Sequence, residues 1–395
     1  MRIATLQIAA KLGDVEGNIQ RADRILENAT LRLNDPQRGL KAGVSVDEAG
    51  LDILVLSEMA LTGYNYPSLD AVKPYVEQAG KGRTAAWAIE TAKRLKCTVC
   101  VGYPEVEIAD SGEVGGEQQP KYYNSLLVVS PTGSILHNYR KTFLYYTDET
   151  WASEGSVKLG SRKLTLPLPL PSSTLNSNSG KSELENNALD PARTRDIATS
   201  FGICMDINPY RFEAPYSAFE FAHRVLDSRS ELVIISMAWL TLLTREELDA
   251  LRGKPEMDTF NYWIQRFLPL IRERIGYASN PDRDFGNTKE EAGEIQEDKE
   301  KRIILVFANR TGEEDGIPLA RYAGTSTIIA VSQTPRRALS PGQPSSDEEG
   351  SDHKKTDFDV KILCWGMLGA ASEGVCFADT AGEPEMVFQL VRKAG

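Results

Sequence analysis

The sequence predicts a layered fold of α-helices and β-strands within one large domain. Its 395 residues are 41% hydrophobic, which is enough to form a sizeable core. Strand-like apolar runs alternate with segments of helical period along the chain, and this favours an α/β or layered α+β architecture over a helical bundle or an all-β barrel. No period of about 20 to 50 residues recurs, so solenoids and propellers are disfavoured.

The predicted elements follow one another in a regular order. The first strand covers residues 3–8, and Gly13 and Asp14 then open a helix whose apolar positions recur every three or four residues. A buried strand at 53–56 ends at Ser57 and Glu58. The later elements are a helix around 85–92, a strand at 97–103, a hairpin of 123–129 and 134–139, strands at 232–237 and 303–307 with a helix around 258–277 between them, and strands at 325–331 and 360–364.

Four polar stretches interrupt this pattern. They are residues 110–121, 167–195, 284–301 and 333–358, all rich in Gly, Ser, Pro or charge and poor in apolar side chains. We interpret them as exposed insertions in a single domain spanning 1–395, and not as linkers between two domains.

Charge and composition exclude several classes of partner. The 45 basic and 56 acidic residues give a net charge of −11, and the basic residues form no stripe, so nucleic acid and anionic membrane surfaces are disfavoured. No segment reaches the roughly 20 apolar residues that a membrane span requires, and neither a signal peptide nor a mitochondrial presequence is recognised at the start of the chain. Five cysteines at irregular spacing indicate reduced thiols. We therefore expect a soluble, cytoplasmic protein with a small neutral or cationic substrate.

Cys204 has the sharpest local signal for catalysis. It ends the apolar run 199–203 and precedes Met205 and Asp206, so the chain is expected to turn sharply just after a strand. Such an elbow presents the thiol and the backbone N–H of Met205 to a pocket. A thiol is only slightly ionised at neutral pH, so a neighbouring base or cation must activate it. The alternative, a small buried hydrophobe, holds for about four in five cysteines taken at random.

Glu58 and Lys141 are the candidates for the base and the cation. Glu58 follows the strand 53–56 at its carboxyl end, where open sheets usually place their ligands, and its apolar neighbours favour a raised pKa. Lys141 precedes an aromatic run, a setting in which an ammonium needs a carboxylate partner such as Glu58 or Glu149. Taken singly, either residue could be an ordinary solvated surface group.

Taken together, these segments resemble the nitrilase superfamily of carbon-nitrogen hydrolases. The matching residues are Glu58 with Gly63-Tyr64, Lys141 in Tyr139-Arg140-Lys141, Cys204 in Cys204-Met205-Asp206, and Glu149 at the offset of a second glutamate found in several amidases of the superfamily. Asn309-Arg310 and 322–326 resemble its later strand segments. The resemblance implies a four-layer αββα sandwich. It also implies helix-mediated homodimers, although the insertions could block that contact.

Within the superfamily, residues 57–65, 141–146 and 206–210 are most similar to the fungal protein N-terminal asparagine amidohydrolases. That resemblance implies deamidation of N-terminal Asn and Gln in the N-degron pathway. Glu58 would be the base, Cys204 the nucleophile, Lys141 and the Met205 N–H the oxyanion donors, and Glu149 a supporting carboxylate. The chemistry requires no metal and no organic cofactor.

Substrate recognition leaves more alternatives open. A free α-amine is cationic, so Asp148, Asp206 or Glu256 could bind it, and Trp239 could form a wall of the pocket. Asp206 could equally fix the turn after the nucleophile, and Trp239 could pack in the core. A small-molecule amidase or N-carbamoyl amino acid hydrolase is the second functional reading, and an inactive nitrilase-like binding module is the third.

Overall fold

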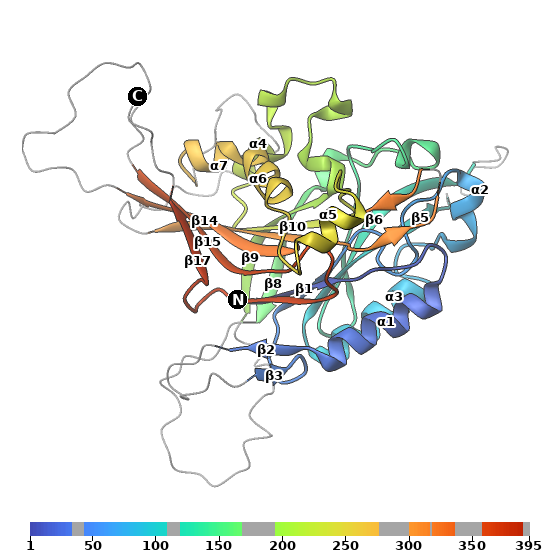
Figure 1. Ribbon diagram of the computed structural model, residues 1–395, viewed down its shortest axis with the longest axis horizontal. Coiled ribbons are helices and arrows are strands. Elements are labelled where there is room, and N and C mark those ends of the chain that lie inside the picture. Colours follow the sequence, from blue (N-terminus) through green and yellow to red (C-terminus); the bar gives the residue numbers. More distant parts are fainter. Residues whose placement is uncertain are drawn as a thin grey trace, which may run out of the picture.

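The computed structural model describes residues 1–33, 43–108, 119–167, 194–275, 300–316, 318–335 and 358–389. Two β-sheets pack face to face, and helices cover the outer face of each (Figure 1). This is the four-layer αββα sandwich that the sequence resemblance implies. In the described part of the chain, no helix has the length and apolar character needed to cross a membrane.

The first sheet has the strand order β16-β1-β4-β5-β6-β7. Its strands are β1 (Arg2–Gln7), β4 (Ile53–Leu56), β5 (Thr98–Glu107), β6 (Lys121–Val129), β7 (Ile135–Arg140) and β16 (Gly374–Asp379). Strands β1, β4 and β5 are parallel, and the other pairings are antiparallel. Helices α1 (Val15–Asn28) and α3 (Arg83–Leu95) bury their apolar faces against its outer side. The Asp14 carboxylate begins α1 by accepting a hydrogen bond from the Gly17 N–H.

The second sheet has the order β17-β15-β14-β11-β10-β9-β8. Its strands are β8 (Ser161–Pro167), β9 (Thr194–Ile203), β10 (Leu232–Met237), β11 (Lys301–Asn309), β14 (Thr327–Pro335), β15 (Phe358–Met367) and β17 (Met386–Gln389). Strands β9, β10 and β11 are parallel. Helices α4 (Glu220–Asp227), α6 (Met257–Arg266) and α7 (Leu268–Arg272) cover its outer face. The smaller elements are α2 (Leu69–Val72), α5 (Arg245–Ala250), the pair β2 (Thr30–Arg32) and β3 (Gly43–Ser45), and the pair β12 (Glu313–Glu314) and β13 (Ala320–Arg321).

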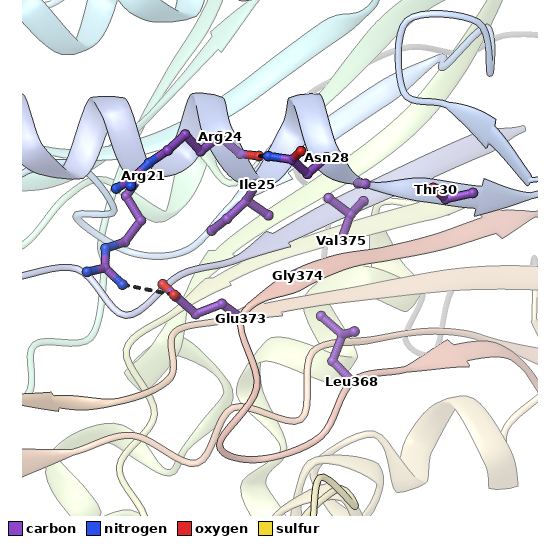
Figure 2. Close-up of a pocket in the computed structure, with 10 residues that line it drawn as sticks. Arg21, Arg24, Ile25, Asn28, Thr30, Leu368, Glu373, Gly374 and Val375 are labelled. Carbon is purple, nitrogen blue, oxygen red and sulfur yellow. Dashed lines mark hydrogen bonds and ion pairs between the residues drawn. The ribbon is translucent and has the colours of Figure 1, made fainter.

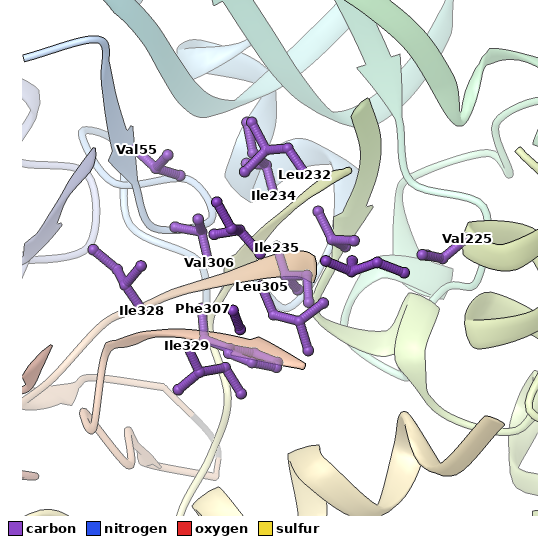
Figure 3. Packing of buried hydrophobic residues seen from close by; sticks show 14 of the residues in the cluster. Val55, Val225, Leu232, Ile234, Ile235, Leu305, Val306, Phe307, Ile328 and Ile329 are labelled. Carbon is purple, nitrogen blue, oxygen red and sulfur yellow. The ribbon is translucent and has the colours of Figure 1, made fainter. Parts of the chain in front are cut away.

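The core between the sheets is largely aliphatic, and the core between the second sheet and its helices is rich in aromatic rings. Figure 3 shows Val55 of β4 beside branched side chains of β10 and β11, such as Ile234 and Val306. On the outer side of the second sheet, the Trp263 ring of α6 stacks on Phe307 of β11 with centroids 5.1 Å apart. Because residues 232–235 of β10 and 303–308 of β11 are buried on both faces, they are continuous apolar runs, and such runs are recognisable in the sequence.

Several predicted boundaries were wrong. The single helix expected at 258–277 is two helices, α6 and α7, with Pro269 in the first turn of the second, since proline has no N–H to continue a helix. Strands β8, β16 and β17 were not predicted. The insertions 110–121, 167–195, 284–301 and 333–358 lie mostly outside the described residues, but their predicted ends include parts of β6, β8, β9, β11, β14 and β15.

Candidate active site

The carboxyl ends of parallel strands from both sheets meet at one edge of the sandwich. Hydrogen bonds join the sheets there: the Ser236 hydroxyl donates to the Leu56 carbonyl at 2.9 Å, and the Glu58 N–H donates to the Met237 carbonyl at 3.3 Å. Glu58, two residues after the end of β4, therefore lies directly against the end of β10. This contact between sheets fixes the position of the predicted base.

The Glu58 carboxylate is fully buried and held by three donors. Its Oε1 accepts from Lys141 Nζ at 2.6 Å and from Asn124 Nδ2 at 2.7 Å, and its Oε2 accepts from the Ala238 N–H at 2.7 Å. Residues from β6, the end of β7 and the end of β10 thus position one carboxylate. The predicted pairing of Glu58 with Lys141 is present in the structure.

Lys141 lies between two carboxylates. Its Nζ donates to Glu58 Oε1 and to Asp148 Oδ2, both at 2.6 Å, and all three side chains are fully buried. Asn124 Nδ2 bridges the same two carboxylates and bonds Asp148 Oδ1 at 2.9 Å. An ammonium has three donor positions, so one N–H of Lys141 is left for a substrate atom.

Cys204 occupies the expected elbow. It follows β9 with φ of +40°, a left-handed conformation that non-glycine residues seldom adopt, and its side chain is only 8% exposed. Asp206 holds this elbow by accepting from the Ile203 N–H at 2.7 Å and from the Thr142 and Phe143 N–H groups at 3.0 and 2.8 Å. The turn after the nucleophile is therefore tied to the residues that follow Lys141.

One backbone group joins the thiol to the base. The N–H of Ala238 bonds Glu58 Oε2 and also interacts with the Cys204 sulfur. The charges of Glu58, Lys141 and Asp148 all act on that sulfur. The structure therefore brings the three predicted catalytic groups into one buried cluster.

The pKa shifts in the cluster follow from burial and charge. Burial raises the pKa of Glu58 above its usual value, and the charge of Lys141 offsets this only in part. Burial and the Glu58 charge also raise the pKa of the Cys204 thiol. Burial alone would lower the pKa of Lys141, but Asp148 and Glu58 outweigh it and raise that pKa. Burial thus disfavours the charged forms of the thiol and of Glu58, whereas the two carboxylates stabilise the charged form of Lys141.

The supporting carboxylate predicted at Glu149 was assigned to the wrong residue. Glu149 is exposed, whereas its neighbour Asp148 is buried and bonds Lys141. Asp148 Oδ2 also accepts from the Tyr64 hydroxyl at 3.3 Å and from the Tyr145 N–H at 3.0 Å. With both oxygens occupied, Asp148 is not free to bind a substrate amine, so that second assignment is corrected too.

We expect Asp148→Asn to lower kcat/KM for amide hydrolysis by about a hundredfold, and Glu149→Gln to leave it near the wild-type value. The negative charge of Asp148 raises the pKa of Glu58, so its removal lowers that pKa and moves the acid limb of the pH–rate profile to lower pH. Ammonia release measured across pH for both variants tests this. Equal losses in the two variants would refute the assignment of the supporting role to Asp148.

The structure also shows the surroundings of the other residues that were predicted to contact the substrate. The Asp206 oxygens are occupied by backbone and hydroxyl donors, so it fixes the turn and is not a free amine ligand. Trp239 is half-buried and packs with its ring centroid 5.5 Å from that of Tyr262, and the core-packing interpretation accounts for this contact. Glu256 retains one buried oxygen, Oε2, without a hydrogen-bond partner among the described residues. Met205 is buried directly after the nucleophile, and oxyanion binding by its N–H stays a prediction.

Three groups that hold the site together were not predicted from the sequence. Asn124 lies in β6, where a lone amide in an apolar run was a signal that could have been read. The Ala238 N–H has no side-chain signature, since it acts through the backbone at the end of β10. Tyr64 was noted only as part of a motif, yet its hydroxyl reaches Asp148 and its ring centroid lies 5.5 Å from Lys141 Nζ.

A glycine in β5 leaves room for the backbone of Glu58 after the neighbouring strand β4. A Cβ on Gly102 would lie 2.6 Å from the Met59 nitrogen and 2.9 Å from the Glu58 Cα, and both are backbone atoms. We expect Gly102→Ala to destabilise the fold by about 1–3 kcal/mol and to lower the turnover of the molecules that remain folded. Urea unfolding together with kcat per folded molecule measures both effects.

Gly366→Ala is the matched control for this substitution. It crowds the Cys376 sulfur and the Phe377 carbonyl oxygen in the region of β15 and β16. It should therefore cost stability without a comparable loss of kcat. If Gly102→Ala also kept the wild-type kcat per folded molecule, the close approach at Glu58 would not matter for catalysis.

A surface hollow of about 610 Å³ lies elsewhere on the molecule. It is formed by residues of α1, by Ala29 and Thr30 just after it, and by Leu368 and the start of β16. Figure 2 shows Arg21 paired with Glu373 at its side. None of its lining residues belongs to the Glu58–Lys141–Cys204 cluster, so it is not the catalytic pocket. Among the described residues, no group of three or more His, Cys, Asp or Glu side chains is arranged to hold a metal ion.

Known proteins resemble this chain in sequence and in fold. A model of the carbon-nitrogen hydrolase family matches residues 2–208. The protein N-terminal amidase of Saccharomyces cerevisiae is 26% identical over 483 aligned positions, which cover 97% of this chain and 95% of that protein. Crystal structures of an N-terminal amidase with an Asn-Glu-Ala peptide and with a Gln-Gly peptide superpose with TM-scores of 0.63 and 0.62, at 23% and 22% identity, each covering 99% of both chains. These structural likenesses establish the fold.

Proposed function

Since the chain belongs to the carbon-nitrogen hydrolase family, we propose that it deamidates N-terminal Asn and Gln of proteins or peptides to Asp and Glu, with release of ammonia. The observation that supports this best is the buried cluster in which Lys141 bonds Glu58 and one backbone N–H connects Glu58 with the Cys204 thiol. The amidase relative in Saccharomyces cerevisiae, aligned over nearly its whole length, supports the choice of an N-terminal substrate.

The proposed reaction begins with attack of sulfur on the side-chain carboxamide. Glu58 accepts the thiol proton as the Cys204 sulfur bonds the carbonyl carbon, and negative charge develops on the carbonyl oxygen. The free N–H of Lys141 and the backbone N–H of Met205 stabilise that oxygen, at about 3 kcal/mol per donor. The raised pKa of Glu58 makes its carboxylate a stronger base than that of an ordinary glutamate.

Three proton transfers complete the cycle. Glu58 returns its proton to the departing nitrogen as the C–N bond breaks, which releases ammonia and leaves a thioester on Cys204. Glu58 next accepts a proton from water, the resulting hydroxide adds to the thioester carbonyl, and the C–S bond breaks with the proton returned to sulfur. The net change is addition of one water to the amide, and no cofactor takes part in any step.

A subsite for the free α-amine is part of the proposal. Asp148 and Asp206 have no spare acceptor, but Glu256 has an unpartnered buried oxygen, so it is the carboxylate among the three predicted candidates with capacity for an ammonium. Conversion of a neutral N-terminal side chain to an acidic one suits an N-degron pathway in the cytoplasm. Pairing of two chains through the outer helices remains a prediction, which the molecular mass in solution tests.

The test is a comparison of ammonia release from several amides. Peptides that begin with free Asn or Gln should be turned over, the same peptides with an acetylated amine should be poor substrates, and free asparagine, free glutamine and N-carbamoyl amino acids should react slowly. Faster release from the free amino acids or the carbamoyl compounds would instead identify a small-molecule hydrolase. No release from any of them would favour an inactive binding module.

A further inference from the structure

Three aromatic side chains from two separate segments meet beside the reacting groups. Tyr145 and Tyr146 follow Lys141 closely in the chain, and Phe212 lies shortly after Cys204. The ring centroids are 5.0 Å apart for Tyr145 and Tyr146, 5.9 Å for Tyr146 and Phe212, and 6.4 Å for Tyr145 and Phe212. We call these three side chains the aromatic cluster.

The aromatic cluster is continuous with the catalytic site. The Tyr145 N–H donates to Asp148 Oδ2 at 3.0 Å, and the same oxygen accepts from Lys141 Nζ at 2.6 Å. From the half-buried Tyr145 the cluster extends to the surface, where Tyr146 is 62% and Phe212 is 46% exposed. The rings therefore form an apolar surface that connects the reacting groups with solvent.

The backbone that presents Phe212 is strained. Arg211 and Phe212 have φ values of +53° and +56°, so two successive residues with side chains adopt the left-handed conformation. The Phe212 N–H bonds the Pro209 carbonyl at 2.9 Å, and this holds the turn. Core packing does not explain a strained turn that exposes a large apolar ring, and strained backbone that the surrounding structure maintains is concentrated at ligand sites.

We propose that the aromatic cluster binds the side chain of the second residue of the peptide, so that substrates with an apolar residue after the N-terminal Asn or Gln react fastest. This inference rests on the proposed function. The reacting amide belongs to the first side chain, and the next Cα is only about 3.8 Å further along the peptide. A leucine side chain at that position buries apolar area against the rings, whereas alanine buries much less.

The test measures kcat/KM for two tripeptides that differ only in the second residue, Asn-Leu-Ala and Asn-Ala-Ala. We expect the wild type to prefer the leucine peptide about fivefold to tenfold. Phe212→Ala and Tyr146→Ala should each reduce this preference toward unity, mainly through KM, and Phe212→Tyr should retain it. Val387→Ala removes an exposed apolar side chain from the distant edge strand β17 and should keep the wild-type preference.

The outcomes distinguish a failure of the proposal for the aromatic cluster from a failure of the proposed function. Wild-type turnover of both peptides without a preference, or a preference that survives in both alanine variants, would overturn the proposal for the cluster while leaving the amidase function intact. No turnover of either peptide by the wild type would overturn both. The two alanine substitutions lie in different segments of the chain, so if one variant misfolds, the other still tests the peptide preference. The unfolding midpoint of each variant shows whether it is folded.

Discussion

The Cys204→Ser protein is expected to fold and to lose ammonia release from an Asn-initiated peptide by a factor of at least about 10⁴. Serine retains the size of the side chain at the elbow, but the pKa of a hydroxyl is far higher than that of a thiol, so Glu58 is too weak a base to activate it. The burial and charge that raise the thiol pKa would act on the hydroxyl in the same direction.

The strained backbone conformation of Cys204 also leads to an expectation for the stability of the variant. Cys204 has φ of +40°, and the Asp206 carboxylate holds the turn at the Ile203 N–H, so we expect serine at this position to adopt the same conformation. The stability of Cys204→Ser should therefore stay close to that of the wild type, which separates loss of chemistry from loss of fold. Cys97→Ala is the control, since this cysteine is buried beside α3 and its removal should spare turnover per folded molecule. Substantial ammonia release by folded Cys204→Ser would refute the role of the sulfur.

Glu58→Gln is expected to have the second largest effect, a loss of about 10³-fold in kcat. The amide cannot accept the thiol proton, and it places an N–H donor where the carboxylate now accepts from Lys141, Asn124 or the Ala238 N–H. Lys141 keeps its bond to Asp148, so the variant tests proton transfer more than charge pairing. Ammonia release and the alkylation rate of Cys204, measured on the same sample, provide the two readouts.

The control for Glu58→Gln is a carboxylate with a structural contact only. Glu77 is half-buried and accepts from the Thr84 N–H at the start of α3, so Glu77→Gln should affect stability and not turnover. In the wild type, activity should rise with pH through a pKa above the ordinary value for glutamate, because only ionised Glu58 is a base. An unchanged pH profile in active Glu58→Gln would show that another group is responsible for proton transfer.

The fold was predictable where burial leaves a strong pattern. Strand β10 was predicted with its observed bounds because all its residues are buried and all but Ser236 are apolar. Strand β16 was missed because it is a short edge strand with alternating exposure, and its pairing with β1 joins the two ends of the chain. A pairing between such distant residues leaves no local signal in one sequence.

The site was predictable to the level of residue type but not of neighbouring positions. A buried ammonium at Lys141 needs a carboxylate, and that argument offered Glu58, which pairs with it, and Glu149, which is exposed. It could not distinguish Asp148 from Glu149, because both lie in one short turn in which the Tyr145 N–H bond to Asp148 directs that side chain inward. The backbone N–H of Ala238 was not predictable, since any residue at that position supplies it.

The central claim is that the Cys204 sulfur becomes covalently bound to the acyl group of the substrate. Peptide-mapped mass spectrometry of the wild-type protein, quenched in acid at successive times through the first turnover of an Asn-initiated peptide, tests it directly. The account predicts an adduct on Cys204 whose mass is that of the peptide less ammonia, and which disappears as the Asp peptide accumulates. An acyl group found on another residue, or complete turnover with Cys204 unmodified at every time, would contradict it.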